Sequence, residues 1–268
     1  MKQRILKLKN TYIGKKVLYI GTGSSVLDLP LNNISNDVYT FGINRFLPFY
    51  KEYWKDFKLD FHLVHDPTVL HMSFYNQFDL RRKNGEHDEE YDLENEVVKK
   101  YKDVSTADYI VNNKVYENTK ILFSHDIKTS HAERFNLIDN SQWIDANKLL
   151  MDTNDNFVSY AIDKNVSTFG TPIEQEDQLL LKLWAKNTFC NTALPLLFYL
   201  GFSEIYLAGV DYSADGYFFC KCKSHNGYVT REFDEREQLI EYSKEVLEHK
   251  PQIIVIKNKN DMVSLLKE

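Results

Sequence analysis

Short apolar runs alternate with helical patterns over the first third of the chain. The runs "KVLYIG", "VYTFGIN" and "LDFHLVHD" predict strands at residues 16–21, 38–44 and 59–66. A turn and a short helix that begins after Ser24 or Ser25 follow the first strand, and "PFYKEYWKDF" predicts an aromatic-rich helix. This alternation of strand and helix indicates βαβ units and a parallel sheet.

The pattern changes in the middle of the chain and then returns. Residues 81–101 are highly charged, and we expect a solvated excursion that ends in a helix. Residues 139–171 are rich in Asn and Asp and show no clear period, so they are interpreted as a substrate-facing lid or an extra subdomain. The other predicted elements are strands at 120–126, 203–211 and 252–258 and helical patterns at 174–187, 192–202, 234–249 and 261–268.

Together these elements predict one α/β domain over residues 1–268, with a Rossmann-like, mostly parallel sheet, helices on both faces, and insertion or lid segments at about 80–172. The hydrophobic fraction of 43% is sufficient for a folded core. The net charge of −6, without a stripe of Lys and Arg, argues against a nucleic-acid partner.

Cysteine usage and hydropathy predict a cytoplasmic protein. Cys190, Cys220 and Cys222 do not have zinc-ligand spacing, and an odd number of cysteines suits a reducing compartment. No apolar run approaches the ~20 residues that span a bilayer. Contact with the inner face of the membrane would therefore have to come from a surface patch, and formation of homo-oligomers stays open.

The sequence "GTGSS" joins the first predicted strand to a helix. Gly21 and Gly23 would let the backbone approach a ligand, and Ser24 or Ser25 could cap the helix or donate to a phosphate. A dinucleotide fingerprint would place another glycine at Val26 and an acid at the end of the second strand, and this chain has neither. The pattern therefore favours a mononucleotide turn, and the alternative is a plain tight turn.

Polar side chains also end the other predicted strands. Asn44–Arg45 ends the second strand, His65–Asp66 the third, and Asp211–Tyr212 the late strand. Because the carboxyl ends of parallel strands meet at one edge of a sheet, these residues and the glycine turn are expected to outline a cleft.

The stretches "GTGSSVLDLP", "DVYTFGINRF" and "NTALPLLFYLGFSEIYLAGVDYSADG" resemble the bacterial lipooligosaccharide sialyltransferases. Those enzymes have a G-N-G-P-S-L turn, an R-C-N-Q strand end and a helix–strand unit close to "ALGYKEIYLSGID". The unit is also similar to one in proteins related to the archaeal hydroxymethylpterin pyrophosphokinase, which are often found in surface-glycan loci. The resemblance covers about the first 66 residues and residues 186–216.

The resemblance implies a glycosyltransferase of the GT-A-variant type that uses a CMP-sugar and needs neither a metal nor a cofactor. Its acceptor would be a surface glycan such as lipopolysaccharide. It also implies residue roles. The nucleotide would contact Gly21, Thr22, Gly23, Ser24, Ser25, Asn44, Lys186, Thr188 and Asp211, while Tyr212 and Tyr217 would stabilise the phosphate and His225 would be the general base.

Alternatives remain for the base and for the reaction. His65 and Asp66 could supply a base or bind a metal, or could simply turn the chain. No D-x-D motif follows a predicted strand, and no P-loop, G-x-S-x-G or H-E-x-x-H motif is present. The rival functions are ATP- and magnesium-dependent pyrophosphoryl transfer and a non-catalytic scaffold that binds a nucleotide or a glycan.

Overall fold

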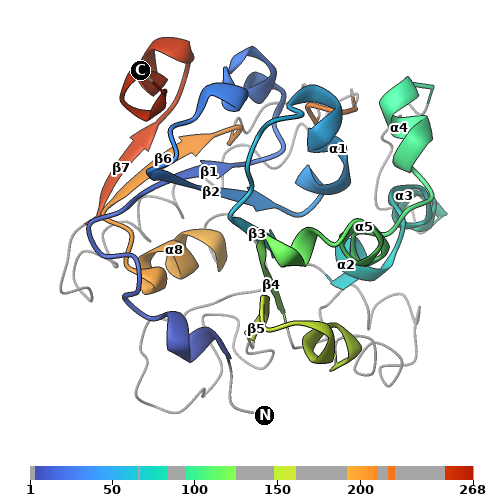
Figure 1. Ribbon diagram of the computed structural model, residues 1–268. Coiled ribbons are helices and arrows are strands. Elements are labelled where there is room, and N and C mark those ends of the chain that lie inside the picture. The colour runs from blue at the N-terminus through green and yellow to red at the C-terminus, as the bar shows by residue number, and fades with distance from the viewer. Residues whose placement is uncertain are drawn as a thin grey trace.

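The computed structural model describes residues 4–65, 67–83, 94–124, 148–160, 192–210, 217–220 and 251–267. Within these residues seven strands form one sheet in the order β5-β4-β3-β2-β1-β6-β7, and every neighbouring pair is parallel (Figure 1). The strands are β1 (Lys16–Ile20), β2 (Val38–Ile43), β3 (Phe61–Val64), β4 (Lys120–Ser124), β5 (Phe157–Tyr160), β6 (Glu204–Ala208) and β7 (Gln252–Val255).

The direction of the chain across the sheet reverses at β1. From β1 the chain moves outward through β2, β3 and β4 to β5, and it then returns to place β6 on the other side of β1. Neighbouring crossovers therefore diverge between β1 and β6. In doubly wound sheets this switch point opens a crevice at the carboxyl ends of the strands, which we call the carboxyl edge.

Apolar layers cover both faces of the sheet, as the sequence predicts. Successive β1 side chains alternate between the faces: Leu18 and Ile20 join the layer that contains α1, whereas Val17 and Tyr19 join the layer that contains α8. The labelled helices are α1 (Phe46–Tyr53), α2 (Pro67–His71), α3 (Phe74–Lys83), α4 (Glu96–Tyr101), α5 (Thr106–Asn112) and α8 (Leu194–Leu200), residues 148–153 are also helical, and 3₁₀ segments lie at Arg4–Leu8, Ser24–Asp28, Leu31–Asn33, Val115–Glu117 and Lys259–Leu265.

Helix α8 is buried along its whole length, consistent with its apolar sequence "LPLLFYL". It ends at Gly201, which has φ +93° in the left-handed region that suits a glycine after a helix. The backbone N–H groups of Asn10 and Tyr12 donate to the carbonyls of Tyr199 and Leu200, both at 2.9 Å. The N-terminal segment thus satisfies the carbonyls that the helix end leaves open.

Most of the predicted strands are confirmed, and the differences lie in the helices and in the middle of the chain. The helices expected after Ser24 and at residues 261–268 are 3₁₀ segments, and α1 begins two residues before the predicted start, at Phe46. Strand β5 comes from the stretch without a clear period. The helices predicted at 174–187 and 234–249 lie outside the described residues, and the insertion at about 80–172 stays a prediction.

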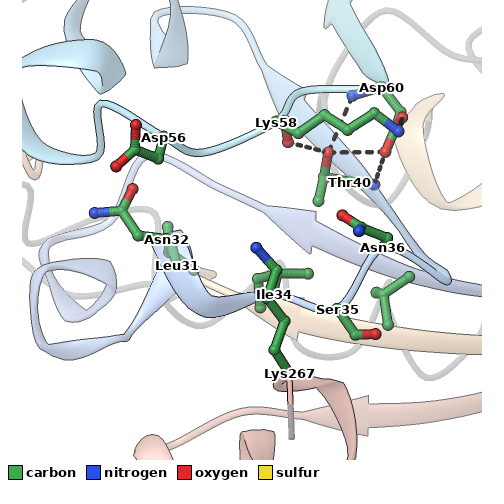
Figure 2. A pocket seen from close by; sticks show the side chains of 11 residues that line it. Leu31, Asn32, Ile34, Ser35, Asn36, Thr40, Asp56, Lys58, Asp60 and Lys267 are labelled. Atoms are coloured by element: carbon green, nitrogen blue, oxygen red, sulfur yellow. Dashed lines mark hydrogen bonds and ion pairs between the residues drawn. The ribbon is translucent and has the colours of Figure 1, made fainter.

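A small hollow of about 50 Å³ lies at the opposite, amino edge of the sheet (Figure 2). Its frame is a set of hydrogen bonds centred on Thr40, which is 2% exposed. The Thr40 hydroxyl donates to the Lys58 carbonyl at 2.6 Å and accepts from the Asp60 N–H at 3.0 Å. Asp60 Oδ2 accepts from the Thr40 N–H at 3.0 Å, and Asp60 Oδ1 pairs with Lys58 Nζ at 2.5 Å. These contacts fix the start of β2 against the turn before β3.

No helix in the described part of the chain is long and apolar enough to cross a bilayer.

We predict that Thr40→Val lowers the free energy of unfolding by about 1–3 kcal/mol, because the variant removes a buried hydroxyl that donates to the Lys58 carbonyl and accepts from the Asp60 N–H. Urea unfolding followed by circular dichroism measures this change. Thr153→Val is the control, since the Thr153 hydroxyl donates to the Leu149 carbonyl at an exposed position. Equal effects of the two substitutions would show that the Thr40 frame adds nothing to stability.

Candidate functional site

The glycine turn, Gly21–Ser25, leaves β1 at the carboxyl edge and lies directly against the end of β6. The Gly21 N–H donates to the Ala208 carbonyl at 2.8 Å, and the Gly23 N–H donates to the Gly209 carbonyl at 3.0 Å. A Cβ atom on Gly21 would lie 2.3 Å from the Gly209 carbonyl oxygen, closer than any side chain allows. Gly21 is therefore required for the contact between the two backbone turns, and its approach to a ligand stays a prediction.

Gly23 has a different environment from Gly21. Its φ of −66° and ψ of 155° are open to any residue, and it occupies the N-cap of the following 3₁₀ segment. The prediction that Ser24 or Ser25 caps this helix is therefore wrong. Both serines lie in the first turn at the carboxyl edge, and contact with a phosphate stays a prediction for them and for Thr22.

Residues 217–220 lie across the glycine turn, although they are far from it in sequence. Gly23 and Tyr217 form an isolated antiparallel bridge, and the Phe218 N–H donates to the Thr22 carbonyl at 2.9 Å. Their rings anchor this segment on α1, since Phe219 stacks on Phe49 with 3.9 Å between ring centroids. Tyr217 stacks on Phe219 at 5.1 Å and is only partly buried. The glycine turn and Tyr217 are thus in backbone contact, and a phosphate contact of Tyr217 stays a prediction.

Asn44 connects the carboxyl ends of β2 and β3. Its φ is +44°, a left-handed conformation that asparagine tolerates better than most residues. The Asn44 N–H donates to the Leu63 carbonyl at 2.7 Å, and the Asn44 side-chain Oδ1 accepts from the His65 N–H at 3.2 Å. The side chain is therefore held at the edge next to the glycine turn, because β2 and β1 are neighbours.

Arg45, the other polar residue at this strand end, points into the protein. It is 4% exposed, and its Nη2 atom donates to the Met72 carbonyl at 3.0 Å and to Gln77 Oε1 at 2.8 Å. Its guanidinium carbon also lies 5.9 Å from the centre of the Phe74 ring. Arg45 thus ties the end of β2 to α3 and to the turn between α2 and α3.

His65 is buried in a cluster with two hydroxyls that sequence reasoning missed, and we call His65, Tyr160 and Thr192 the His65 cluster. The His65 Nδ1 atom lies 3.2 Å from Tyr160 Oη and 3.1 Å from Thr192 Oγ1. Tyr160 ends β5, and Thr192 precedes α8. The sequence signal for this strand was the short stretch "FVSY" at residues 157–160, within a region otherwise without a clear period. Its last residue, Tyr160, lies at the same edge of the sheet as the other strand ends.

A second histidine, His62, lies within β3 and is fully buried. Burial lowers its pKa to about 3, and interaction with the Asn44 backbone partly opposes this shift. His62 is therefore neutral at physiological pH, and it packs within the core beneath the strand ends.

The described residues of the candidate site are the glycine turn, Asn44, Tyr217 and His65 at the carboxyl edge. Within the described ranges no group of three or more His, Cys, Asp or Glu side chains could hold a metal ion. Asp155, from the acidic stretch "DTND", is paired with Arg4 at 3.0 Å. The other predicted site residues, Asp66, Lys186, Thr188, Asp211, Tyr212 and His225, lie outside the described residues.

Comparison with known proteins finds no matching family model and no similar curated protein. Similar solved structures are sialyltransferases. The CstII enzyme of Campylobacter jejuni in complex with CMP-3FNeuAc is 15% identical, with 94% of this chain and 85% of that chain covered and a TM-score of 0.37. CST-II in complex with a trisaccharide acceptor and CMP is 17% identical, with 90% and 80% covered and a TM-score of 0.40. The α-2,3-sialyltransferase of Campylobacter jejuni in apo form is 13% identical, with 92% and 78% covered and a TM-score of 0.33.

We predict that Gly21→Ala lowers the free energy of unfolding by about 3 kcal/mol or more, because its Cβ would force the turns after β1 and β6 apart. Gly14→Ala is the matched control. Gly14 has φ +78° and nothing within 4 Å of an added Cβ, so it carries only the strain of a left-handed alanine, about 1–2 kcal/mol. Chemical unfolding measures both variants, and a Gly21→Ala loss no larger than that of Gly14→Ala would contradict the close contact.

Because His62 is buried in its neutral form, we predict that the free energy of unfolding falls as the pH is lowered below about 6.5. The folded pKa of His62 is about 3, so between these values only the unfolded state takes up its proton. Uptake of this one proton by the unfolded state lowers the free energy of unfolding by about 1.4 kcal/mol per pH unit, or by about 2 kcal/mol at pH 5. Unfolding measured from pH 7 to pH 5 should give a shallower slope in His62→Leu than in the wild type. Equal slopes would mean that His62 gains its proton in the folded protein.

Proposed function

We propose that the protein is a glycosyltransferase that transfers a sugar from a nucleotide donor to a surface-glycan acceptor. The observation that carries this proposal is the bridge between Gly23 and Tyr217 at the β1–β6 switch point. It joins the glycine turn to a tyrosine from the loop after β6, the two segments to which the sequence resemblance gives the nucleotide and its phosphate. The proposed donor is CMP-linked and sialic-acid-like.

The proposed reaction displaces CMP from the anomeric carbon of the donor sugar. An acceptor hydroxyl attacks this carbon, the bond from the carbon to the phosphate oxygen breaks, and a general base takes the hydroxyl proton. His225 is proposed as the base. Tyr212, Tyr217 and Lys186 are proposed to stabilise the charge that develops on the phosphate, since hydroxyls and a cation can do this without a metal. Thr188 and Asp211 are proposed nucleotide contacts, and an acceptor on a membrane glycan would bring the reaction to the inner face of the membrane.

Thermal shift with CMP, UDP, GDP and ATP tests the nucleotide preference. We expect CMP to raise the melting temperature most, by the same amount in EDTA as in magnesium, because no step of the proposed reaction uses a metal. Preference for ATP with magnesium would instead support a pyrophosphokinase.

Release of CMP from a CMP-sugar tests for catalysis, with and without an oligosaccharide acceptor. His225→Ala should lower the rate by roughly 10²-fold or more while CMP binding is retained. A wild-type protein that binds CMP but never turns over a CMP-sugar would be a scaffold and not an enzyme.

A further inference from the structure

Strand β7 (Gln252–Val255) ends the described sheet on the side of β6 (Figure 1). Gln252 is exposed, and Val255 is 40% exposed. Ile253 and Ile254 are only partly buried, the first against the layer that contains α8 and the second against the layer that contains α1. No charged residue interrupts positions 252–256. An apolar edge strand without charges is a template for pairing with a further strand.

The other end of the described sheet, at β5, is covered by the chain itself. All four residues of β5 are buried. Arg4 Nη1 donates to the Phe157 carbonyl at 3.0 Å, and it also donates to the carbonyls of Met151 at 3.0 Å and Asn154 at 2.8 Å. The N-terminal segment thus protects one end of the described sheet, whereas the side chains of β7 reach the solvent at the other.

The backbone groups of β7 point alternately toward β6 and toward the outer edge. The Gln252 N–H donates to the Ser203 carbonyl at 2.8 Å, and the Ile256 N–H donates to a β6 carbonyl at the same distance. Since successive residues of a paired strand direct their N–H and C=O groups to opposite sides, those of Ile253 and Val255 point away from β6. Within the described ranges, no hydrogen bond is recorded for these outward groups.

A second, antiparallel β7 can pair with all of these outward groups in one register. In this register Ile254 lies opposite the same residue of the second copy, and Ile253 lies opposite Val255. Two residues that face each other with outward N–H and C=O groups exchange two hydrogen bonds. Because the arrangement has a two-fold axis at Ile254, the pair occurs twice, and both residues of both copies are satisfied.

The residues that flank β7 disfavour the two neighbouring registers. A shift in one direction would place Val255 opposite Pro251, which has no N–H to donate. A shift in the other direction would place Ile253 opposite Lys257, whose N–H already donates to Asp261 Oδ2 at 2.8 Å. Either shift would therefore leave an outward carbonyl without a partner.

We propose that β7 pairs with β7 of a second copy of this chain, antiparallel and centred on Ile254, so that the two sheets join into one. In this register Gln252 lies opposite Ile256 and Pro251 lies opposite Lys257, so like charges do not face each other. The two-fold contact is self-complementary and closes at two copies. Because the paired strands run in opposite directions, the carboxyl edges of the copies face opposite ways. Dimer formation is therefore independent of the proposed function.

The small size of the contact predicts a weak dimer. One short strand from each copy buries less than the ~1,200 Å² at which stable interfaces begin, and contacts of that size are transient. We therefore expect a dissociation constant of about 1–100 µM.

Sedimentation velocity from about 1 to 200 µM protein tests for this dimer. The wild type should shift from monomer to dimer as the concentration rises, and Val255→Lys should weaken dimer formation by at least about tenfold, since an edge lysine opposes strand pairing. Val111→Lys is the matched control. Val111 is 39% exposed on α5, so it receives the same substitution and charge away from β7, and it should dimerise like the wild type.

Two results of this experiment would overturn the proposal. A wild type that stays monomeric over the whole range would leave the β7 edge to a strand of another protein. Equal sedimentation of Val255→Lys and Val111→Lys at every concentration would place any dimer contact elsewhere.

Disulfide cross-linking tests the register without depending on the fold of the lysine variant. Opposite residues in an antiparallel pair lie about 4.5–5.5 Å apart at Cα, within reach of a disulfide. We expect Ile254→Cys to give a covalent dimer after mild oxidation. Gln252→Cys is the control on the same strand, because in this register its two copies lie about 13 Å apart. The wild type monitors the native cysteines. A covalent dimer from Gln252→Cys but not from Ile254→Cys, or from neither, would overturn the proposal.

Discussion

The structure depends on one contact, the close approach of the backbone turns that follow β1 and β6. Gly21 and Gly209 lie so near each other that a Cβ atom on either would clash with the other turn. This approach lets the Gly23 N–H reach the Gly209 carbonyl, and the bridge from Gly23 to Tyr217 follows directly from it. At the switch point between β1 and β6, the glycine turn and residues 217–220 are therefore joined by backbone hydrogen bonds.

The carboxyl edge combines a rigid backbone with buried neutral polar groups. His62 is kept neutral by burial, and the His65 Nδ1 atom lies within hydrogen-bond distance of the Tyr160 and Thr192 hydroxyls. Neutral hydrogen-bonded groups avoid the large cost of burying a charge, while they still fix the side chains around them.

The sequence was sufficient for six of the seven described strands and for the edge at which polar residues gather. Strands of a parallel sheet are buried on both faces, so "KVLYIG" and "EIYLA" stand out as apolar runs without alternation. Strand β5 was missed because it is short and lies in a stretch dominated by Asn and Asp. Tyr160 and Thr192 could not be assigned for a related reason: their role comes from contact with His65, which is distant in sequence and becomes a neighbour only through the sheet order β5-β4-β3.

The position of Val26 shows what replaces the third glycine of a dinucleotide fingerprint. In that motif the third glycine allows the helix to pack closely on the strand. Here Val26 is fully buried, and a Cβ on Gly209 would lie 2.5 Å from its Cγ1 atom. In this chain the glycine of the contact is Gly209, after β6, and it leaves space for the Val26 side chain. The absence of a third glycine is therefore matched by the packing of Val26 against Gly209, the residue that follows β6.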